Sequence, residues 1–312
     1  MSHLGEIISL VVAVSWTFSA WFADKASRKI GSMETNVIRL VLATIFLSLL
    51  LWVTVGKPWP VHADGKAWLW LGLSAVVGYV FGDYCLFNSY LCIGPRLGQL
   101  MMTIAPPMAA VAGWIMLGET LTGKSILAMA VTLCGIGISI LSRGEKKSHL
   151  KLDIPFKGIL LGLGAGTGQG VGLVLSKIGM GHYESAVPAG SPAAMVTMLP
   201  FASTLIRAII GAVGFIILLW ISKGLGSLKT AVRDPKGMKY ATLLTVFGPA
   251  LGVSLSLMAV RYANAGIAST LMALTPVLII APDALINKHK IKLKEIIGVL
   301  VSVTGVAMFF LL

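Results

Sequence analysis

The stretch VVGYVFG at residues 76–82 has a counterpart, VFGPALG, at residues 246–252, in which the first valine and both glycines keep their places. We call this alignment, which places Gly78 on Gly248, the repeat register. It also pairs Pro106 with Pro276. Such an ungapped register extends over several apolar segments. It predicts that the second half of the chain is a copy of the first.

The composition is that of a membrane protein. Of the 312 residues, 56% are hydrophobic and 12% are charged, and the mean hydropathy is +0.89. Soluble domains carry about 25% charged residues, so this chain has too little charge to cover a water-facing surface. The net charge of +13 does not indicate nucleic-acid binding, because lysines and arginines fall in short loops between apolar runs, where membrane proteins place them.

Ten apolar runs approach the length of about 20 residues that a membrane-spanning helix needs. The runs are continuous and do not alternate, which excludes a closed β-barrel. Helices are the remaining way to satisfy backbone groups in lipid. The sequence therefore predicts an all-α integral membrane protein with ten transmembrane helices, at about residues 5–23, 36–56, 67–91, 98–117, 125–142, 158–176, 202–222, 240–260, 266–284 and 295–312.

The most hydrophilic stretch divides the chain into two units. We expect a first five-helix repeat at residues 1–142, a basic connecting loop at 143–157 and a second five-helix repeat at 158–312. Because five is an odd number, the second repeat enters the membrane from the opposite side. This predicts that residues 31–34 and 199–202 lie on opposite faces. Inverted repeats are the architecture on which many secondary transporters build alternating access.

The end of the first unit carries the motifs PPM at residues 106–108, GW at 113–114 and LGETLT at 117–122, and a glycine-rich span around Gly135 and Gly137 follows. These motifs resemble those of EamA-type members of the drug/metabolite transporter (DMT) superfamily. The resemblance covers essentially the whole chain as two EamA-like units. It implies a ten-helix fold in the inner (plasma) membrane and the export or exchange of amino acids, other metabolites or drugs.

The second half departs from the family pattern at one position. The residue that corresponds to Glu119 is His289, inside the sequence NKHK at residues 287–290, so the Leu-Gly-Glu signature is lost there. This departure argues against a role shared by the glutamates of both halves.

Asp83 is the strongest candidate for a functional side chain, because it lies well inside the third span. A carboxylate inside a membrane span normally faces a water-filled cavity or a partner. Tyr79 lies one turn away on a similar face, and Tyr84 adds polarity beside it. Gln169 in the sixth span is a candidate hydrogen-bonding contact for the substrate. Two interpretations of Asp83 stay open. It binds substrate or a coupling proton, or it forms a structural ion pair.

Arg39 and Arg207 occupy equivalent places in the second and seventh spans, because the dipeptide IR at residues 38–39 recurs at residues 206–207. They either extend toward the membrane surface, pair with Asp83, or bind an anion in a central cavity. Trp16 in the first span is a candidate for lining the same cavity, and a lipid-facing Trp16 is the alternative.

Small residues and prolines predict sites of packing or gating. Alternate glycines in the sixth span form two stacks at spacing four, which indicates close helix packing or a bendable helix beside a substrate. The prolines of spans four and nine either kink these helices or lie at their mouths. The residues predicted to act in gating or packing are Gly78, Gly82, Gly166, Gly170, Pro106 and Pro276.

The sequence thus predicts a secondary transporter that moves a small metabolite by alternating access, as an exporter or exchanger. Its expected partners are a small-molecule substrate, the lipid bilayer and protons as coupling ion, with no nucleic acid, cofactor, metal or catalytic residue. A channel or scaffold is the first alternative. An intramembrane enzyme is less favoured, because all five histidines are predicted to lie outside the spans. Residues 118–125 match the P-loop pattern, but a lipid-spanning helix precedes them in place of a strand, so ATP binding is not expected.

Most lysines and arginines fall in the odd-numbered loops between the predicted spans. Because these residues concentrate on the cytoplasmic side of membrane proteins, their distribution predicts that both termini lie outside the cell. The family resemblance implies the opposite orientation.

Overall fold

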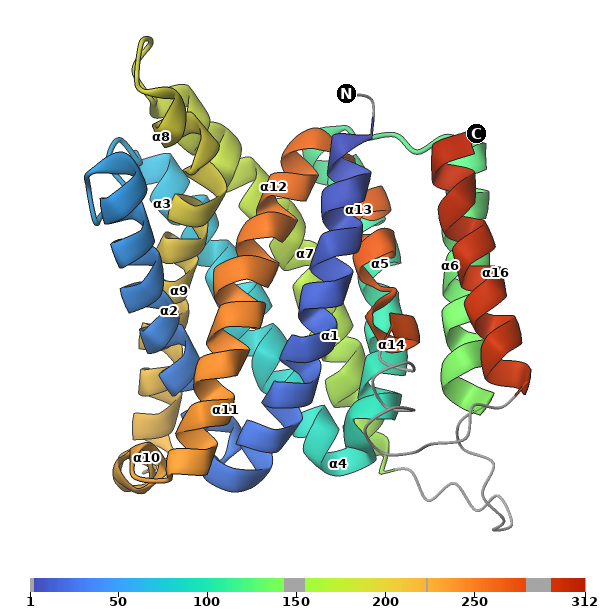
Figure 1. Cartoon of the computed structure of the whole chain (residues 1–312), viewed down its shortest axis with the longest axis horizontal. Coiled ribbons are helices and arrows are strands. Elements are labelled where there is room, and N and C mark those ends of the chain that lie inside the picture. The colour runs from blue at the N-terminus through green and yellow to red at the C-terminus, as the bar shows by residue number, and fades with distance from the viewer. Residues whose placement is uncertain (1–2, 143–154, 223, 279–292, 312) are drawn as a thin grey trace.

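The computed structural model describes residues 3–142, 155–222, 224–278 and 293–311, and these residues form a bundle of helices without a strand (Figure 1). Many large apolar side chains, such as Trp52, Trp114 and Trp220, are exposed on its outside. A surface of this kind is suited to lipid. The predicted all-α membrane fold is confirmed.

The first half contains six α-helices and two short segments of altered helical geometry. Its elements are α1 (Leu4–Ile30), α2 (Ser32–Val55), α3 (Gly65–Ala75), the π-helix η1 (Val76–Asp83), α4 (Tyr84–Met101), the 3₁₀-helix η2 (Met102–Ile104), α5 (Ala105–Leu117) and α6 (Gly123–Ser142). The segments α3, η1 and α4 continue one another and form a single span as far as Gly94, where the backbone leaves the helical conformation.

The second half follows the same plan. Its elements are α7 (Phe156–Ala186), α8 (Ala193–Thr197), α9 (Leu199–Ile221), α10 (Leu225–Val232), α11 (Pro235–Thr245), the π-helix η3 (Val246–Val253), α12 (Ser254–Tyr262), α13 (Ala265–Met272), α14 (Thr275–Leu278) and α16 (Leu293–Leu311). The short helix α8 lies in the loop before the seventh span, and α10 is an addition that the sequence did not predict.

Nine helices in the described part of the chain are long and apolar enough to cross a membrane, and Ala265–Leu278 forms a shorter apolar tenth. The end of the predicted span 266–284, His289 and most of the predicted connecting loop 143–157 lie outside the described residues. Several helices are longer than predicted. The helix α7 extends to Ala186 and so includes His182, which the sequence analysis placed outside the spans. The predictions are shorter because an apolar run ends where the lipid ends, whereas the helix itself continues beyond the lipid until its backbone is interrupted.

The second half lies inverted relative to the first. The helix α2 begins at one end of the bundle, whereas its counterpart α9 begins at the opposite end (Figure 1). Three features recur in the repeat register. The side chain of Asp64 caps α3 and that of Asp234 caps α11. The third and eighth spans each contain an eight-residue π-helix, η1 and η3. Pro106 and Pro276 each stand in the first turn of a new helix after an interruption, in α5 and α14.

The cap at Asp234 lies outside the membrane-spanning helices and also shows why α11 begins there. The backbone N–H groups of Gly237 and Lys236 donate hydrogen bonds to this carboxylate. These bonds favour the charged form and hold the pKa of Asp234 below its ordinary value. Pro235, at the first helical position, loses nothing by lacking an N–H there.

The glycine stacks of α7 contact two different neighbours. A Cβ atom on Gly170 would lie 3.0 Å from the backbone nitrogen of Ala109 in α5, and one on Gly172 would lie 3.0 Å from Gly78 in η1. Gly166 faces Ile104 and Ala105 in the same way. These glycines therefore act in packing, because they let three spans approach one another at backbone distance. The helix α7 itself is continuous from end to end.

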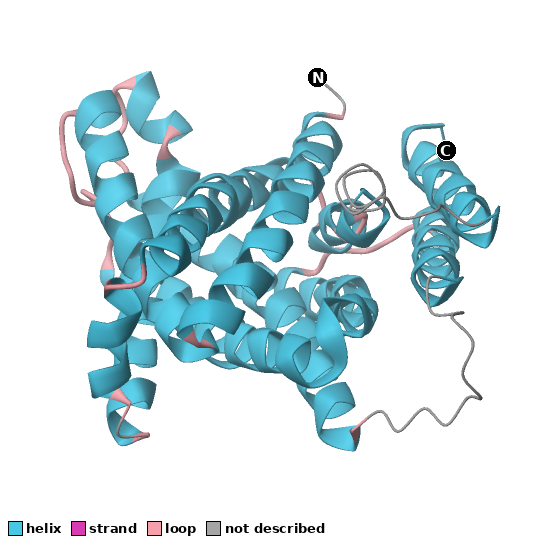
Figure 2. Cartoon of the chain, turned by 60° about the horizontal axis from the view of Figure 1, so that its bottom comes forward, coloured by secondary structure: helices cyan, strands magenta, loops and turns pink. Residues whose placement is uncertain are grey.

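The helices α6 and α16 form a separate pair at the edge of the bundle (Figure 2). A Cβ atom on Gly135 would lie 2.8 Å from the carbonyl oxygen of Gly298 and would also collide with Ser302. Gly137, two residues further along α6, has open space around it. The pair therefore depends on the absence of a side chain at Gly135.

We expect Gly135→Ala to destabilise the protein by about 1–3 kcal/mol relative to Gly137→Ala, because overpacking against backbone forces the helices apart. The gain in helix propensity is the same in both variants, so it cancels. The comparison is made by thermal unfolding in detergent. Equal unfolding temperatures for the two variants would contradict the close approach of α6 and α16.

Candidate functional site

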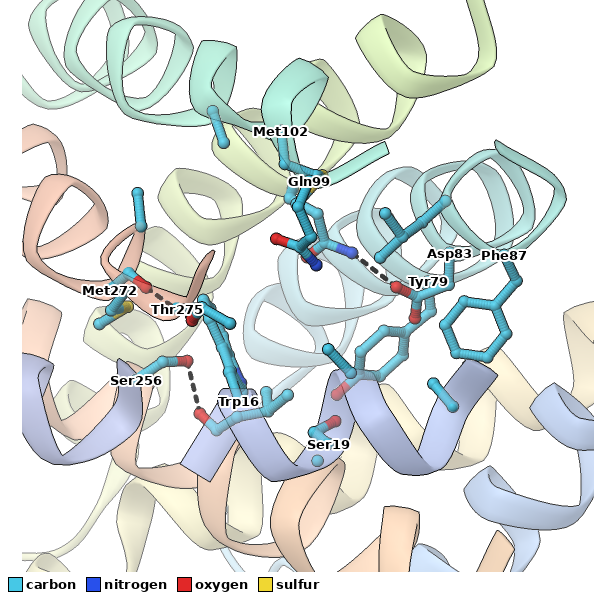
Figure 3. A pocket seen from close by; sticks show the side chains of 18 of the residues that line it. Trp16, Ser19, Tyr79, Asp83, Phe87, Gln99, Met102, Ser256, Met272 and Thr275 are labelled. Carbon is cyan, nitrogen blue, oxygen red and sulfur yellow. Dashed lines mark hydrogen bonds between the residues drawn. The ribbon is translucent and has the colours of Figure 1, made fainter. Parts of the chain in front are cut away.

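A cavity of ≈ 140 Å³ lies between the two halves of the bundle (Figure 3). Its walls come from both repeats. The first repeat contributes residues of α1, α2, η1, α4, η2 and α5, and the second contributes residues of α7, α9, α11, η3, α12, α13 and α14. Arg39 stands seven residues inside α2, about 10 Å from the start of that helix at 1.5 Å per residue. The cavity therefore reaches deep into the membrane-spanning part of the molecule.

Six of the seven residues that the sequence analysis proposed for this site line the cavity. They are Trp16, Arg39, Tyr79, Asp83, Gln169 and Arg207. The seventh, Tyr84, does not line it and is 36% exposed. It directly follows Asp83 along a helix, and successive side chains of a helix point in different directions.

Asp83 and Arg39 form an ion pair inside the bundle, and both side chains are buried. One carboxylate oxygen of Asp83 accepts from Arg39, and the other accepts from Nε2 of Gln169 at 2.7 Å. Nε of Arg39 also donates to the side chain of Asn36 at 2.9 Å. Both oxygens of Asp83 are therefore occupied by protein groups, as in the structural ion pair considered above, while the residue still faces the cavity.

The π-helix η1 and its glycines bring these groups together. Nε2 of Gln169 donates a second hydrogen bond, at 3.1 Å, to the carbonyl oxygen of Gly78 inside η1. A Cβ atom on Gly82 would lie 3.4 Å from the same nitrogen, at van der Waals contact distance, so Gly82 lies directly beside Gln169. Short π-helical segments are often found at functional sites, and here one holds Asp83 at its end.

Arg207 approaches the same place from the other half of the chain. Its guanidinium carbon lies 4.6 Å from the ring centre of Tyr79, and that of Arg39 lies 5.5 Å from the same centre. Tyr79 is thus in contact with both guanidinium groups, an arrangement stabilised by the negative face of the ring. The cavity wall combines two arginines, one carboxylate and an aromatic ring.

The chain just before Pro106 and Pro276 adds two hydroxyl groups to the wall. Thr103 donates to the carbonyl oxygen of Leu100 at 2.6 Å, and Thr275 donates to that of Met272 at 3.0 Å. Both threonines face the cavity. Thr275 thereby satisfies the carbonyl oxygen to which Pro276, having no N–H, cannot donate.

Sequence reasoning missed several residues that line the cavity. They include Phe87, Gln99, Met102, Ser256, Met272 and Thr275 (Figure 3). Met102 and Met272 carried a signal, because they are paired in the repeat register. Within the described residues, no group of three or more histidine, cysteine, aspartate or glutamate side chains is placed to hold a metal ion.

A second polar cluster lies at the end of the molecule where α1 begins and α16 ends. Nζ of Lys177 in α7 donates to Glu119 at 2.5 Å and to the carbonyl oxygen of Ala263 at 2.8 Å. The other oxygen of Glu119 accepts from the backbone nitrogen of Ala265, at the start of α13, at 2.8 Å. A carboxylate at a helix N-terminus is favourable. Glu119 thereby ties the end of the first repeat to the second.

Another ion pair lies at the same end of the molecule. Arg261 pairs with Glu184 and also donates to the carbonyl oxygen of Val196 at 3.0 Å. The loops and helix ends on this side of the cavity are therefore held together by charged side chains from α7, from α12 and from the loop after α5.

Among curated proteins, this sequence is similar to proteins that are named as exporters. Over 154 residues, 46% of this chain and 49% of the relative, the sequence is 32% identical to the threonine/homoserine exporter RhtA of Salmonella typhimurium strain SL1344. Over 163 residues, 49% of this chain and 52% of the relative, it is 29% identical to the protein of the same name from Escherichia coli K12. The chain spans about half the length of the curated relatives it matches.

Comparison with solved structures finds the same fold elsewhere. One crystal structure aligns with the whole of this chain and 98% of its own, with a TM-score of 0.70 and 13% sequence identity. At this identity the likeness concerns the arrangement of helices alone.

The family comparison covers almost the whole chain. The model of the EamA-like transporter family matches twice, over residues 3–141 and again over residues 156–311. The resemblance found in the sequence is confirmed, and the location in the membrane follows from it. This chain belongs to the EamA-like transporter family and is a multi-pass protein of the inner membrane.

Proposed function

We propose that this protein is a secondary transporter that exports or exchanges a small amino-acid-like metabolite across the inner membrane by alternating access. The observation that carries the proposal is the cavity between two inverted repeats, in which Arg39, Asp83 and Arg207 lie deep inside an apolar bundle. Ionisable residues inside a membrane are costly, and they generally mark a pathway for ions or substrates.

The names of the two relatives restrict the range of candidate solutes. Both are named as exporters of threonine and homoserine, which are small, hydroxylated amino acids. A cavity of ≈ 140 Å³ fits a solute of this size, since a cavity of about 150 Å³ holds a benzene-sized molecule. Hydroxyl groups of Thr103, Ser256 and Thr275 lie in the wall. The names of the relatives also favour a transporter over an enzyme.

Alternating access is supported by the symmetry of the fold. Two inverted copies of one unit can exchange conformations, which converts a cavity open to one side into a cavity open to the other. The Lys177–Glu119 pair joins the two repeats at one end of the molecule, whereas the Arg261–Glu184 pair joins two helices of the second repeat at the same end. In this proposal the Lys177–Glu119 pair closes that end of the cavity and separates when the halves rock.

The decisive experiment is counterflow in proteoliposomes. We expect liposomes that contain purified protein and are loaded with unlabelled L-threonine or L-homoserine to accumulate the labelled amino acid faster than unloaded ones, with saturation at high concentration. A carrier shows trans-stimulation because the loaded binding site returns faster than the empty one. Flux without saturation or trans-stimulation would favour a channel, and no flux of either amino acid would remove the proposed substrates.

The proposed closure at the Lys177–Glu119 pair gives a second prediction. A cysteine is placed at Ser269 in the cavity, and a membrane-impermeant maleimide is added from the side on which α1 begins and α16 ends. We expect Lys177→Met to increase the rate at which this cysteine is labelled by about tenfold or more. Loss of a hydrogen bond to a charged group is worth about 1.5–3 kcal/mol, and about 1.4 kcal/mol corresponds to tenfold.

Lys157 provides the control for this labelling experiment, because it is exposed and lies at the other end of the same helix, α7. Both variants are made in a background from which the native cysteines have been removed. Equal labelling rates for Lys177→Met and Lys157→Met would exclude the pair as a closing contact.

Coupling to protons is the third testable part of the proposal, with Asp83 as the proton site. The charged or titratable groups around it are Arg39, Arg207, Tyr79 and Tyr90. Protonation of Asp83 removes the charge that holds Arg39, which frees both groups to move. We expect Asp83→Asn to slow transport and to abolish its dependence on pH. Transport by this variant at the wild-type rate across the pH range would exclude Asp83 from coupling.

The single variant leaves the buried Arg39 without a partner, and breaking a buried pair costs about 3–5 kcal/mol. The double variant Arg39→Gln/Asp83→Asn replaces the pair by two neutral, hydrogen-bonding side chains and avoids this cost. We expect the double variant to fold like the wild type and to lack the pH dependence. A pH profile unchanged in the double variant would contradict the coupling role in a protein that is fully folded.

A further inference from the structure

Arg207 is a buried cation without a polar partner among the described residues. Its side chain lines the cavity and is only 4% exposed. Its Nε is buried without a hydrogen-bond partner, and no described residue forms an ion pair with it. Its guanidinium carbon lies 4.6 Å from the centre of the Tyr79 ring.

The duplication of the chain explains why this arginine is unpaired. Arg39 and Arg207 are equivalent in the two repeats, and Arg39 has Asp83 as its partner. The residue that corresponds to Asp83 in the repeat register is Val253, which also lines the cavity. The second repeat has therefore kept the arginine and lacks the carboxylate.

The described cavity wall consequently has an excess of positive charge. Its charged members are the two arginines and Asp83. The charge of Asp83 is balanced by Arg39, so one positive charge remains, at Arg207. Asp83 also attracts Arg207, but one carboxylate cannot balance two guanidinium groups, and an uncompensated buried charge is strongly disfavoured. The site is therefore complete only when an anionic group enters it.

We propose that Arg207 binds the carboxylate group of the transported solute, with its guanidinium supported by the Tyr79 ring. This assignment rests on the proposed transport function and deepens it. A guanidinium presents its donors in a planar fork that matches a carboxylate. A single excess charge matches a single carboxylate, and the cavity volume of ≈ 140 Å³ restricts the solute to a small one.

The first test measures stability without any ligand and compares the two equivalent arginines. We expect Arg207→Met to raise the unfolding temperature of the ligand-free protein in detergent by roughly 2 °C or more, because it removes an unpaired buried charge. We expect Arg39→Met to lower it by at least as much, because Asp83 then loses its partner. Destabilisation by both substitutions would assign Arg207 a structural role and overturn the proposal.

The second test measures ligand binding by thermal shift at constant chloride concentration. We expect L-threonine and sodium acetate to stabilise the wild type, and L-threoninol, which lacks the carboxylate, to have no effect. Arg207→Gln should weaken the response to L-threonine at least tenfold, and Arg207→Lys, which keeps the charge without the fork, should give an intermediate result. Arg28→Gln, at an exposed pair, is the control.

The outcomes separate this inference from the proposed function. If the wild type transports neither amino acid, the proposed substrates are wrong, while the stability comparison and the acetate titration still decide the role of Arg207. Equal responses of wild type and Arg207→Gln to carboxylates would overturn the inference even if transport is observed. Sodium chloride is tested in the same way, with ionic strength held constant by sodium sulfate. If it stabilises the wild type as much as sodium acetate does, the site binds an inorganic anion, and the inference is also overturned.

Discussion

The compensation of charge inside an apolar bundle is the constraint on which the site depends. Asp83 and Arg39 are stable in lipid surroundings only because each is the partner of the other, and Gln169 occupies the remaining oxygen of the carboxylate. This pair connects α2, η1 and α7, three spans that come from both halves of the chain. A pair that is buried and directional fixes the relative positions of these helices more strictly than apolar contacts can, since the latter have no preferred direction. The cavity forms beside this fixed point.

The glycines of α7 make the arrangement possible. Gln169 can reach Asp83 and the carbonyl oxygen of Gly78 only because α7 and η1 approach at backbone distance, with Gly168 and Gly172 against Gly78 and Gly82. In lipid there is little hydrophobic driving force between helices, so such close packing has to supply the attraction. The packing and functional interpretations of these glycines are therefore connected, since the same close contact that holds the helices together also places the polar side chains of the site.

The sequence predicted the parts of this structure that depend on composition and register, and it missed those that depend on local backbone geometry. The repeat register predicted the duplication that appears in η1 and η3, and the buried charge of Asp83 pointed to the cavity. Tyr84 was misplaced because it directly follows Asp83, and successive side chains of a helix point in different directions. No residue pattern predicted the π-helix η1. The contact between Lys177 and Glu119 joins positions 58 residues apart. Only the folded chain brings these two side chains together.

The difference between the repeats is as informative as their similarity. A transporter that alternates between two mirrored conformations needs two copies of one scaffold, and the shared π-helices, caps and proline breaks provide it. A binding site needs asymmetry, because a small solute presents one carboxylate and not two. Under our proposal, two arginines with a single aspartate meet both requirements, because Asp83 pairs with Arg39 and Arg207 stays available for the solute. In the proposed assignment, Val253 stands where the first repeat has Asp83, and this single difference leaves Arg207 available to an anion.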